Sequence, residues 1–151
     1  MITCSAAANP QVRLEGKRMS ILKRIPFEEV LAAAHAVWAD KSTAVKIALE
    51  TVEIISRVYK RKFMFINGKS SKGLVGGLFY LLGYRHSVVK KQYEIADKLG
   101  TTEVTIRNSY RQWLTEFPDL FLDVIATFAK DDNLRYFVLL DLEQKRLQSQ
   151  H

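Results

Sequence analysis

The segment Gly73–Tyr84, with the sequence GLVGGLFYLLGY, is apolar almost without interruption. A helix that is apolar on all sides lies buried among other elements. We therefore expect a central helix from Ser70 or Ser71 to about Tyr84, which the rest of the chain must cover. Three of its four glycines lie in the first half of the segment, where each costs about 1 kcal/mol in helix propensity relative to alanine, so we expect neighbouring helices to approach closely there. These glycines are Gly73, Gly76 and Gly77.

Amphipathic helices are predicted on both sides of this segment. Their approximate ranges are 26–40, 42–61, 119–129 and 133–149. Pro26, followed by Glu28 and Glu29, is typical of a helix start, and Ser42 or Thr43 is the expected cap of the second helix. The inward residues of that helix are predicted to be Val45, Leu49, Val52, Ile55 and Tyr59. No segment alternates as a half-buried strand does, so the predicted fold class is all-α.

Residues 92–114 are predicted to form two short helices joined by a tight turn, as in a helix-turn-helix. The first helix has an apolar stripe at helical spacing, formed by Ile95, Ala96 and Leu99. Gly100 should end it in a left-handed conformation, and the hydroxyls of Thr101 and Thr102 can cap the second helix. The core face of the second helix consists of Ile106, Tyr110, Trp113 and Leu114.

The opposite face of this second helix carries cationic and polar side chains about one turn apart. Its residues are Val104, Arg107, Asn108 and Arg111. Arg can form two hydrogen bonds to guanine, Asn can do the same to adenine, and Val can contact a thymine methyl group. The pattern predicts DNA binding. A helical hairpin with an ordinary charged outer face is the open alternative, because helix-turn-helix patterns match many unrelated sequences.

Positive charge is concentrated in the part of the chain that contains this motif. Residues 1–116 carry 19 Lys and Arg against 10 Asp and Glu, whereas 117–151 carry 4 against 6. This balance favours a polyanionic partner. The basic residues that directly precede the motif are Arg85, Lys90 and Lys91, and we expect the two lysines to contact phosphates. Weaker candidates for phosphate contacts lie at the end of an earlier helix; they are Arg57, Lys60 and Lys62. Cations that face solvent and favour the C-terminal end of that helix would explain this cluster equally well.

Catalysis and cofactor chemistry find no support in the sequence. A single cysteine, Cys4, excludes an internal disulfide and a cysteine-rich zinc site. The three histidines lack metal-ligand spacing, and the glycines of the central helix do not form a phosphate-binding loop. We expect no enzyme activity, no metal and no cofactor. No apolar run approaches the ~20 residues that span a bilayer, so no membrane partner is expected, and the cysteine usage favours an intracellular location.

Residues 68–121 resemble the second cyclin-like repeat of transcription factor IIB and of its archaeal counterpart, transcription factor B. The resemblance rests first on the entry to the central helix, through Gly68, Lys69, Gly73, Leu74 and Tyr80. It is densest in the helix-turn-helix, through Gln92, Glu94, Ile95, Ala96, Thr102, Glu103, Val104, Thr105, Ile106, Arg107, Asn108 and Tyr110. The exit Pro118-Asp119-Leu120-Phe121 is also similar to the family.

The resemblance implies a single cyclin-like domain of five core helices that contains the helix-turn-helix. Their implied ranges are about 43–61, 70–84, 88–99, 102–116 and 118–129. It also implies that the 102–116 helix enters the major groove beside a TATA box. In that arrangement Val104 and Arg107 face base edges. Contacts to phosphates are carried over to Thr102, Thr105, Asn108 and Arg111. Double-stranded DNA is then the partner, with TATA-binding protein and RNA polymerase as further candidates, in an archaeal cytoplasm and nucleoid or a eukaryotic nucleus.

The chain also departs from the family. The family has two cyclin-like repeats and an N-terminal zinc ribbon, whereas this sequence shows one repeat and one cysteine. Ser71 and Lys91 stand where the family usually has Pro and Thr. The helices at 27–40 and 133–149 have no counterpart in the resemblance. We expect a truncated or accessory paralogue, a viral or plasmid relative, or a competitor that could not alone perform the work of the initiation factor.

Three regions follow from these patterns. Residues 1–25 are expected to form a flexible basic tail, 26–130 the cyclin-like domain with its helix-turn-helix at 88–116, and 131–151 a C-terminal helix that packs on the domain or on a partner. A cyclin-fold protein-interaction module that does not read DNA sequence is the second functional hypothesis. Its partner would be another protein or a second copy of the chain, as a homodimer.

Overall fold

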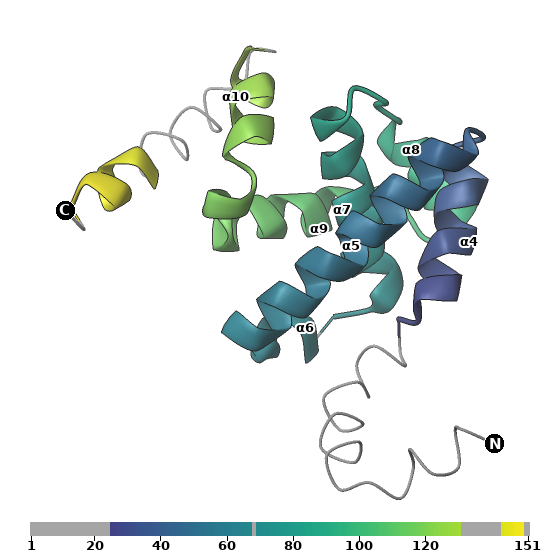
Figure 1. The fold of residues 1–151 in the computed structure, drawn as a ribbon, viewed down its shortest axis with the longest axis horizontal. Coiled ribbons are helices and arrows are strands. Elements are labelled where there is room, and N and C mark those ends of the chain that lie inside the picture. Colours follow the sequence, from purple (N-terminus) through teal and green to yellow (C-terminus); the bar gives the residue numbers. More distant parts are fainter. Residues whose placement is uncertain (1–24, 68, 131–142, 150–151) are drawn as a thin grey trace, which may run out of the picture.

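The computed structural model describes residues 25–67, 69–130 and 143–149 (Figure 1). Within these ranges the chain is helical and contains no strand. The helices, labelled as in Figure 1, are α4 (Phe27–Val37), α5 (Lys41–Arg61), α6 (Phe63–Asn67), α7 (Ser71–Arg85), α8 (Gln92–Leu99), α9 (Glu103–Glu116), the 3₁₀ turn η1 (Pro118–Leu120) and α10 (Leu122–Lys130). Residues 143–149 are also helical. The predicted all-α class is confirmed.

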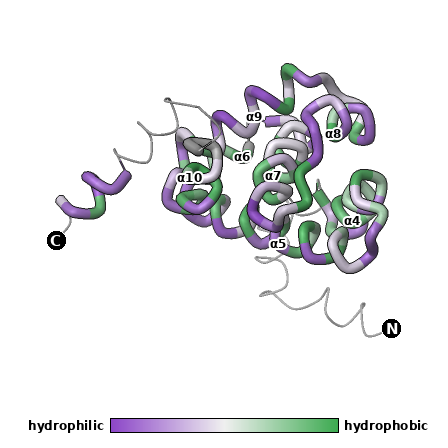
Figure 2. The backbone as a smooth tube through the Cα atoms, turned by 90° about the horizontal axis from the view of Figure 1, so that it is seen from above, coloured by the Kyte–Doolittle hydropathy of each residue, from purple (hydrophilic) through white to green (hydrophobic). Residues whose placement is uncertain are grey.

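Helix α7 is the centre of the domain, as the sequence predicts. All its residues from Gly73 to Gly83 are buried, and it packs against α5, α8, α9 and α10 (Figures 1 and 2). Helix α4 covers α5 and α8 on the outside, and its neighbour Trp38 places its ring 5.3 Å from that of Phe79 in α7. This arrangement is all-α and cyclin-like. None of the described helices is both long and apolar enough to cross a membrane.

The glycines of α7 mark the place where α9 crosses it. A Cβ atom added at Gly76 would lie 2.3 Å from Cδ1 of Ile106, and one at Gly77 would lie 2.9 Å from the backbone nitrogen of Tyr110. The crossing also carries hydrogen bonds. The Ser109 hydroxyl donates to the carbonyl of Gly73 at 2.5 Å. The predicted close approach is therefore confirmed at Gly76 and Gly77.

Several helix boundaries differ from the prediction. Pro26 is the residue before α4 and not its first residue, and α4 ends at Val37. Helix α5 is capped by Asp40, whose carboxylate accepts the backbone N–H of Thr43 at 2.9 Å, so the expected caps Ser42 and Thr43 are wrong. Helix α8 begins at Gln92 and not at 88. The short helix α6 was not predicted.

The inward face predicted for α5 is partly wrong: Val52, Ile55 and Tyr59 pack in or against the core as predicted, but Leu49 does not. Its buried residues are Ala44, Ile47, Ala48, Thr51, Ile54, Ile55 and Val58. Of the predicted set, Ile55 alone is fully buried, whereas Leu49 is 55% exposed. The helix has apolar residues on more than one side, and the buried side contains two alanines and a threonine that hydropathy ranks below Leu49. Packing against the neighbouring helices, which small side chains permit, decided between the two sides.

The C-terminal part also differs from the prediction. In place of one helix from Asp119, the chain forms η1 and then α10, which begins at Leu122. Phe121 between them is fully buried, and it anchors this break against Trp113, whose ring lies 6.3 Å away. The expected tail (residues 1–24) and most of the expected last helix (131–142) lie outside the described residues. The three predicted regions remain predictions.

Gly77→Leu should destabilise the fold, because its side chain has no space at the α7–α9 crossing. Overpacking of this kind costs ~1–3 kcal/mol or more. Ala32→Leu adds a side chain to an exposed position of α4 and should leave the unfolding free energy close to that of the parent. Chemical denaturation of both variants tests this, and a Gly77→Leu variant as stable as the parent would contradict the tight crossing.

Thr51→Val should stabilise the protein. The Thr51 hydroxyl is fully buried and has no hydrogen-bond partner among the described residues, and an unsatisfied buried polar group costs ~1–3 kcal/mol. Thr127→Val is the matched control, because the Thr127 hydroxyl is exposed and donates to the carbonyl of Asp123 at 3.2 Å. A rise in melting temperature for Thr51→Val alone is the expected result. A fall would show that the hydroxyl has a partner.

Candidate nucleic-acid interface

The predicted helix, turn and helix are present as α8, residues 100–102 and α9. Gly100 ends α8 in the left-handed conformation, with φ 69° and ψ 41°. The N–H of Thr101 then bonds to the carbonyl of Ala96 at 2.9 Å, which satisfies the end of the helix as expected of a glycine cap. Thr102 caps α9, since its hydroxyl oxygen accepts the N–H of Thr105 at 3.1 Å.

Helix α9 is fixed by one face and exposed on the other. Its buried residues are Ile106, Ser109, Tyr110, Trp113 and Leu114, and the Trp113 indole N–H donates to the carbonyl of Leu74 in α7 at 3.2 Å. On the outer face Val104 is 57% exposed. Asn108 and Arg111 are also exposed, and Arg107 is partly exposed. The structure thus brings these four predicted residues together on one solvent-facing strip, which we call the α9 outer face.

The two arginines of the α9 outer face are unpaired, in contrast to the other arginines that the structure describes. Within the part of the chain that the structure describes, neither Arg107 nor Arg111 has an ion-pair partner. Other cations are engaged: Arg57 with Glu53 at 2.7 Å, Arg61 with Asp119 at 2.8 Å, and Lys62 with Glu116. The pairing of Arg57 and Lys62 weakens these two predicted phosphate contacts. An unpaired guanidinium keeps its donors free for a ligand.

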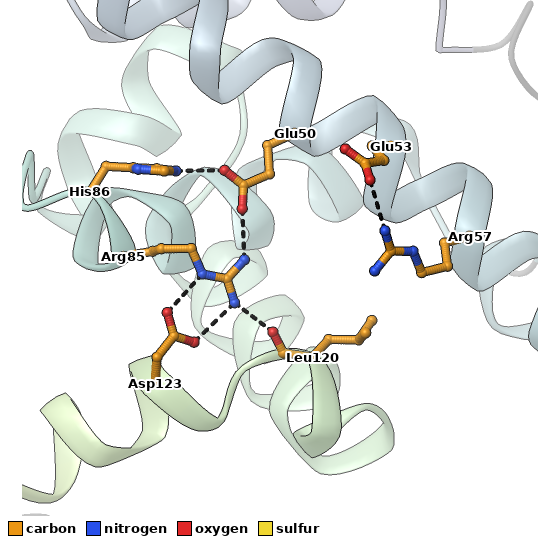
Figure 3. A network of polar contacts seen from close by, with 7 residues as sticks. All are labelled: Glu50, Glu53, Arg57, Arg85, His86, Leu120 and Asp123. Atoms are coloured by element: carbon orange, nitrogen blue, oxygen red, sulfur yellow. Dashed lines mark hydrogen bonds and ion pairs between the residues drawn. The ribbon is translucent and has the colours of Figure 1, made fainter.

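Arg85 belongs to a network of polar contacts inside the domain (Figure 3). It is therefore not part of the group of basic residues predicted to precede the motif. Its guanidinium bonds to Glu50 of α5 at 2.7 Å, to both carboxylate oxygens of Asp123 of α10, at 2.9 and 3.0 Å, and to the carbonyl of Leu120 at 2.5 Å. The ring of His86 lies 2.5 Å from the second oxygen of Glu50. This network joins α5, α7 and α10, and sequence spacing gave no signal for it because its members are far apart in the chain.

The ionisation of the network follows from these contacts. Burial alone would raise the pKa of Glu50, but the hydrogen bonds and charges of His86 and Arg85 outweigh it, and the pKa lies below its ordinary value. Asp123 behaves in the same way: burial opposes its ionisation, yet Arg85 holds its pKa below the ordinary value. The two carboxylates in turn outweigh the burial of Arg85 and raise its pKa.

The two predicted phosphate-contacting lysines lie at the start of α8, away from the α9 outer face in sequence. Lys91 is exposed, and its ammonium lies 5.8 Å from the centre of the Tyr93 ring. Lys90 lines an open depression of about 730 Å³. Three carboxylates line the same depression, and they belong to Glu94, Asp97 and Glu103. Lys90 therefore has both negatively and positively charged side chains around it.

No metal site is found in the residues that the structure describes. Within them, no three side chains of His, Cys, Asp or Glu are grouped closely enough to hold an ion. The open depressions at the surface are lined by mixed polar and apolar side chains. The strongest candidate for a functional surface is therefore the α9 outer face together with the cations around it.

The fold and this surface define a class of protein, an all-α, cyclin-like domain that presents one helix with unpaired guanidinium groups to solvent. Comparison with known proteins identifies the family to which part of the chain is related. The chain is 42% identical over 66 residues to transcription initiation factor IIB of Aeropyrum pernix, a match that covers 44% of this chain and 20% of that protein. It is 34% identical over 67 residues to the factor of the same name from Pyrococcus furiosus, covering 44% of this chain and 22% of that protein.

A further relative, transcription initiation factor IIB of Methanococcus aeolicus, is 41% identical over 54 residues, which is 36% of this chain and 16% of that protein. The relationship to the transcription factor IIB family is thus shown over part of the chain. The chain spans about a fifth of the length of the curated relatives it matches. No protein-family model and no solved structure matches it. The comparisons give no support to a homodimer.

Glu50→Gln should destabilise the fold at neutral pH, by ~1–3 kcal/mol, because it removes a charged acceptor from Arg85 and His86. Since the folded pKa of Glu50 lies below its ordinary 4.5, the charge stabilises the fold above about pH 4.5 and this stabilisation is lost as the pH falls through the folded pKa. The stability gap between parent and variant should therefore close on acidification.

Glu53→Gln is the control for this prediction. Glu53 pairs with Arg57 on the surface of α5, and an exposed pair contributes little. Urea unfolding at a series of pH values from neutral to acidic measures both variants. A gap for Glu50→Gln that stays constant with pH would contradict the proposed role of its charge.

Proposed function

We propose that this protein binds double-stranded DNA by placing the α9 outer face in the major groove, in a transcription-related role. The observation that carries the proposal is the contrast between Arg107 and Arg111, which are unpaired within the described part of the chain, and the paired arginines elsewhere. Two supports are independent of it. The relatives are named transcription initiation factors and not enzymes, and the chain carries a net charge of +7.

The residues of the α9 outer face would take separate roles. Arg107 would bond a guanine through two parallel donors and Val104 would contact a thymine methyl group. Thr102, Thr105, Asn108 and Arg111 would hold phosphates, which set the position of the helix on the duplex without reading sequence. The hydroxyls of Thr102 and Thr105 lie 2.9 Å apart. Because one of them donates its hydrogen to the other, the accepting hydroxyl keeps its own hydrogen for a phosphate.

The buried face of α9 supports this proposal through rigidity. A recognition helix must hold its side chains within a small tolerance of the base edges. Here Tyr110 and Trp113 are buried against α7, and the Ser109 hydroxyl bonds to the α7 backbone. The helix would therefore meet DNA with its outer side chains already oriented.

TATA-binding protein and RNA polymerase are proposed partners on the strength of the resemblance to the transcription factor IIB family, and an intracellular location follows from the same proposal. Because the matched segments cover a small share of the relatives, the proposal concerns DNA binding and does not extend to the whole activity of an initiation factor.

A protein-interaction module remains the second candidate, and exposed apolar side chains favour it. Met64 and Phe63 of α6 are 69% and 52% exposed. Leu49 and Val45 line an open depression of about 530 Å³ on the outside of α5. Such side chains can mark a contact with another protein. The two candidates are compatible, since these residues lie on α5 and α6 and the α9 outer face does not use them.

Arg107→Ala tests the proposal directly. After a preferred duplex is selected from a random pool, this variant should lose ~1–3 kcal/mol of binding free energy on that duplex and much less on random DNA. Arg57→Ala is the matched control, because it removes the same charge from an exposed, ion-paired position of α5. The double variant with Val104→Ala should lose most sequence preference at an unchanged melting temperature.

Two outcomes separate the alternatives. Equal loss on every duplex would make Arg107 a phosphate contact. If neither the parent nor any variant binds duplex DNA, the proposal fails and the protein-interaction candidate takes its place.

A further inference from the structure

Two lysines that the sequence pattern did not single out lie beside the turn between α8 and α9. Lys72 is in the first turn of α7, and its ammonium nitrogen lies 3.5 Å from the point that a Cβ atom of Gly100 would occupy. Lys98 is in the last turn of α8. Both are exposed, and both line one depression of about 190 Å³, together with Ser71 and Leu99. The fold thus brings together cations that are 26 residues apart.

The electrostatic surroundings distinguish Lys72 from Lys90. One carboxylate, that of Glu29, lines the depression that Lys72 shares with Lys98. Lys90 lines the other depression, which contains three carboxylates, and Lys98 lies at the edge of both. No ion pair engages Lys72 or Lys98 within the described residues. Positive potential should therefore be stronger around Lys72, on the α7 side of the turn, than around Lys90, at the start of α8.

This surface is continuous with the predicted recognition helix. The methyl group of Thr105 lies 3.4 Å from the point that a Cβ atom of Gly73 would occupy, so the start of α7 touches the first turn of α9. The turn that the two lysines flank leads directly into Thr102, the cap of α9. A helix whose N-terminal part lies in a major groove about 12 Å wide has phosphates on both sides of it.

The chain also enters the fold at this place. Ile25, the first described residue, is buried and lines the same depression as Lys72 and Lys98. The 24 residues that precede it carry five Lys and Arg against one Glu.

We propose that Lys72 and Lys98 form a phosphate-binding pair that anchors the backbone of duplex DNA beside the recognition helix. This inference rests on the proposed function. It assigns the main contact with the DNA backbone outside α9 to Lys72 and Lys98. Lys90 and Lys91 then contribute less to the binding free energy. An ammonium suits this task because a phosphate contact needs a point charge and no fixed fork of donors.

The alternative for these lysines is a purely structural one. Both lie near the C-terminal end of α8, where a cation stabilises the helix through its dipole. In that case their removal would lower the melting temperature and leave the affinity for DNA unchanged. Thermal unfolding therefore accompanies every binding measurement.

The test uses the full chain and a salt titration of binding to two duplexes, the preferred one and a random one. Lys72→Ala/Lys98→Ala should lower affinity about ten-fold or more on both duplexes equally at ~0.1 M salt, and should reduce the slope of log affinity against log salt by about 2. Lys72→Arg/Lys98→Arg should restore both. Lys90→Ala/Lys91→Ala should show a smaller change in affinity and slope.

Lys41→Ala/Lys46→Ala is the charge-matched control. Both residues are exposed on α5, so this variant loses two charges outside the turn and should keep the parent's slope. Equal losses in the control and in the Lys72/Lys98 variant would show a general effect of net charge and overturn the inference. So would an unchanged salt slope in the Lys72/Lys98 variant. A parent that binds no duplex would instead overturn the proposed function itself.

Discussion

The close crossing of α7 and α9 is the contact on which the rest of the structure depends. Gly76 and Gly77 leave no side chain between the two helix backbones, so Ile106 and Ser109 fill the space directly. Hydrogen bonds from Ser109 and Trp113 to the α7 backbone then fix the rotation of α9 about its own axis and its position along α7. Because one face of α9 is held in this way, the opposite face is determined as well. The position of the candidate DNA-binding residues is a consequence of packing in the core.

The cations of the domain fall into two groups: some are paired with carboxylates of the protein, and others have no ion-pair partner among the described residues. Arg85 holds α5 to α10 through Glu50 and Asp123, and its burial makes the loss of either carboxylate costly. Arg61 and Lys62 bind carboxylates of η1 and α9 near the other end of α5. Arg107 and Arg111 of α9, and Lys72 and Lys98 beside the turn before it, have no such partners in the described ranges. Their donors are therefore not engaged by carboxylates of the protein, although Glu103 lies in the first turn of α9.

The relationship to transcription initiation factor IIB agrees with this division and extends over less than half of the chain. Helix α4 and the exposed apolar side chains of α5 and α6 lie outside residues 68–121, the segment that resembles the family. These features are where this protein can differ from its longer relatives in what it binds.

The sequence by itself determined the all-α class, the central position of α7, the turn at Gly100 and the composition of the α9 outer face. Each of these follows from local chemistry: continuous apolar residues, glycine conformation, and spacing along one helix. Tertiary structure alone decided which side of α5 is buried, which residues pair with Arg85, and that Lys72 and Lys98 line the same depression. Those outcomes depend on contacts between residues that are far apart in the chain. Hydropathy and periodicity describe one segment at a time, so they carry no information about which segments meet.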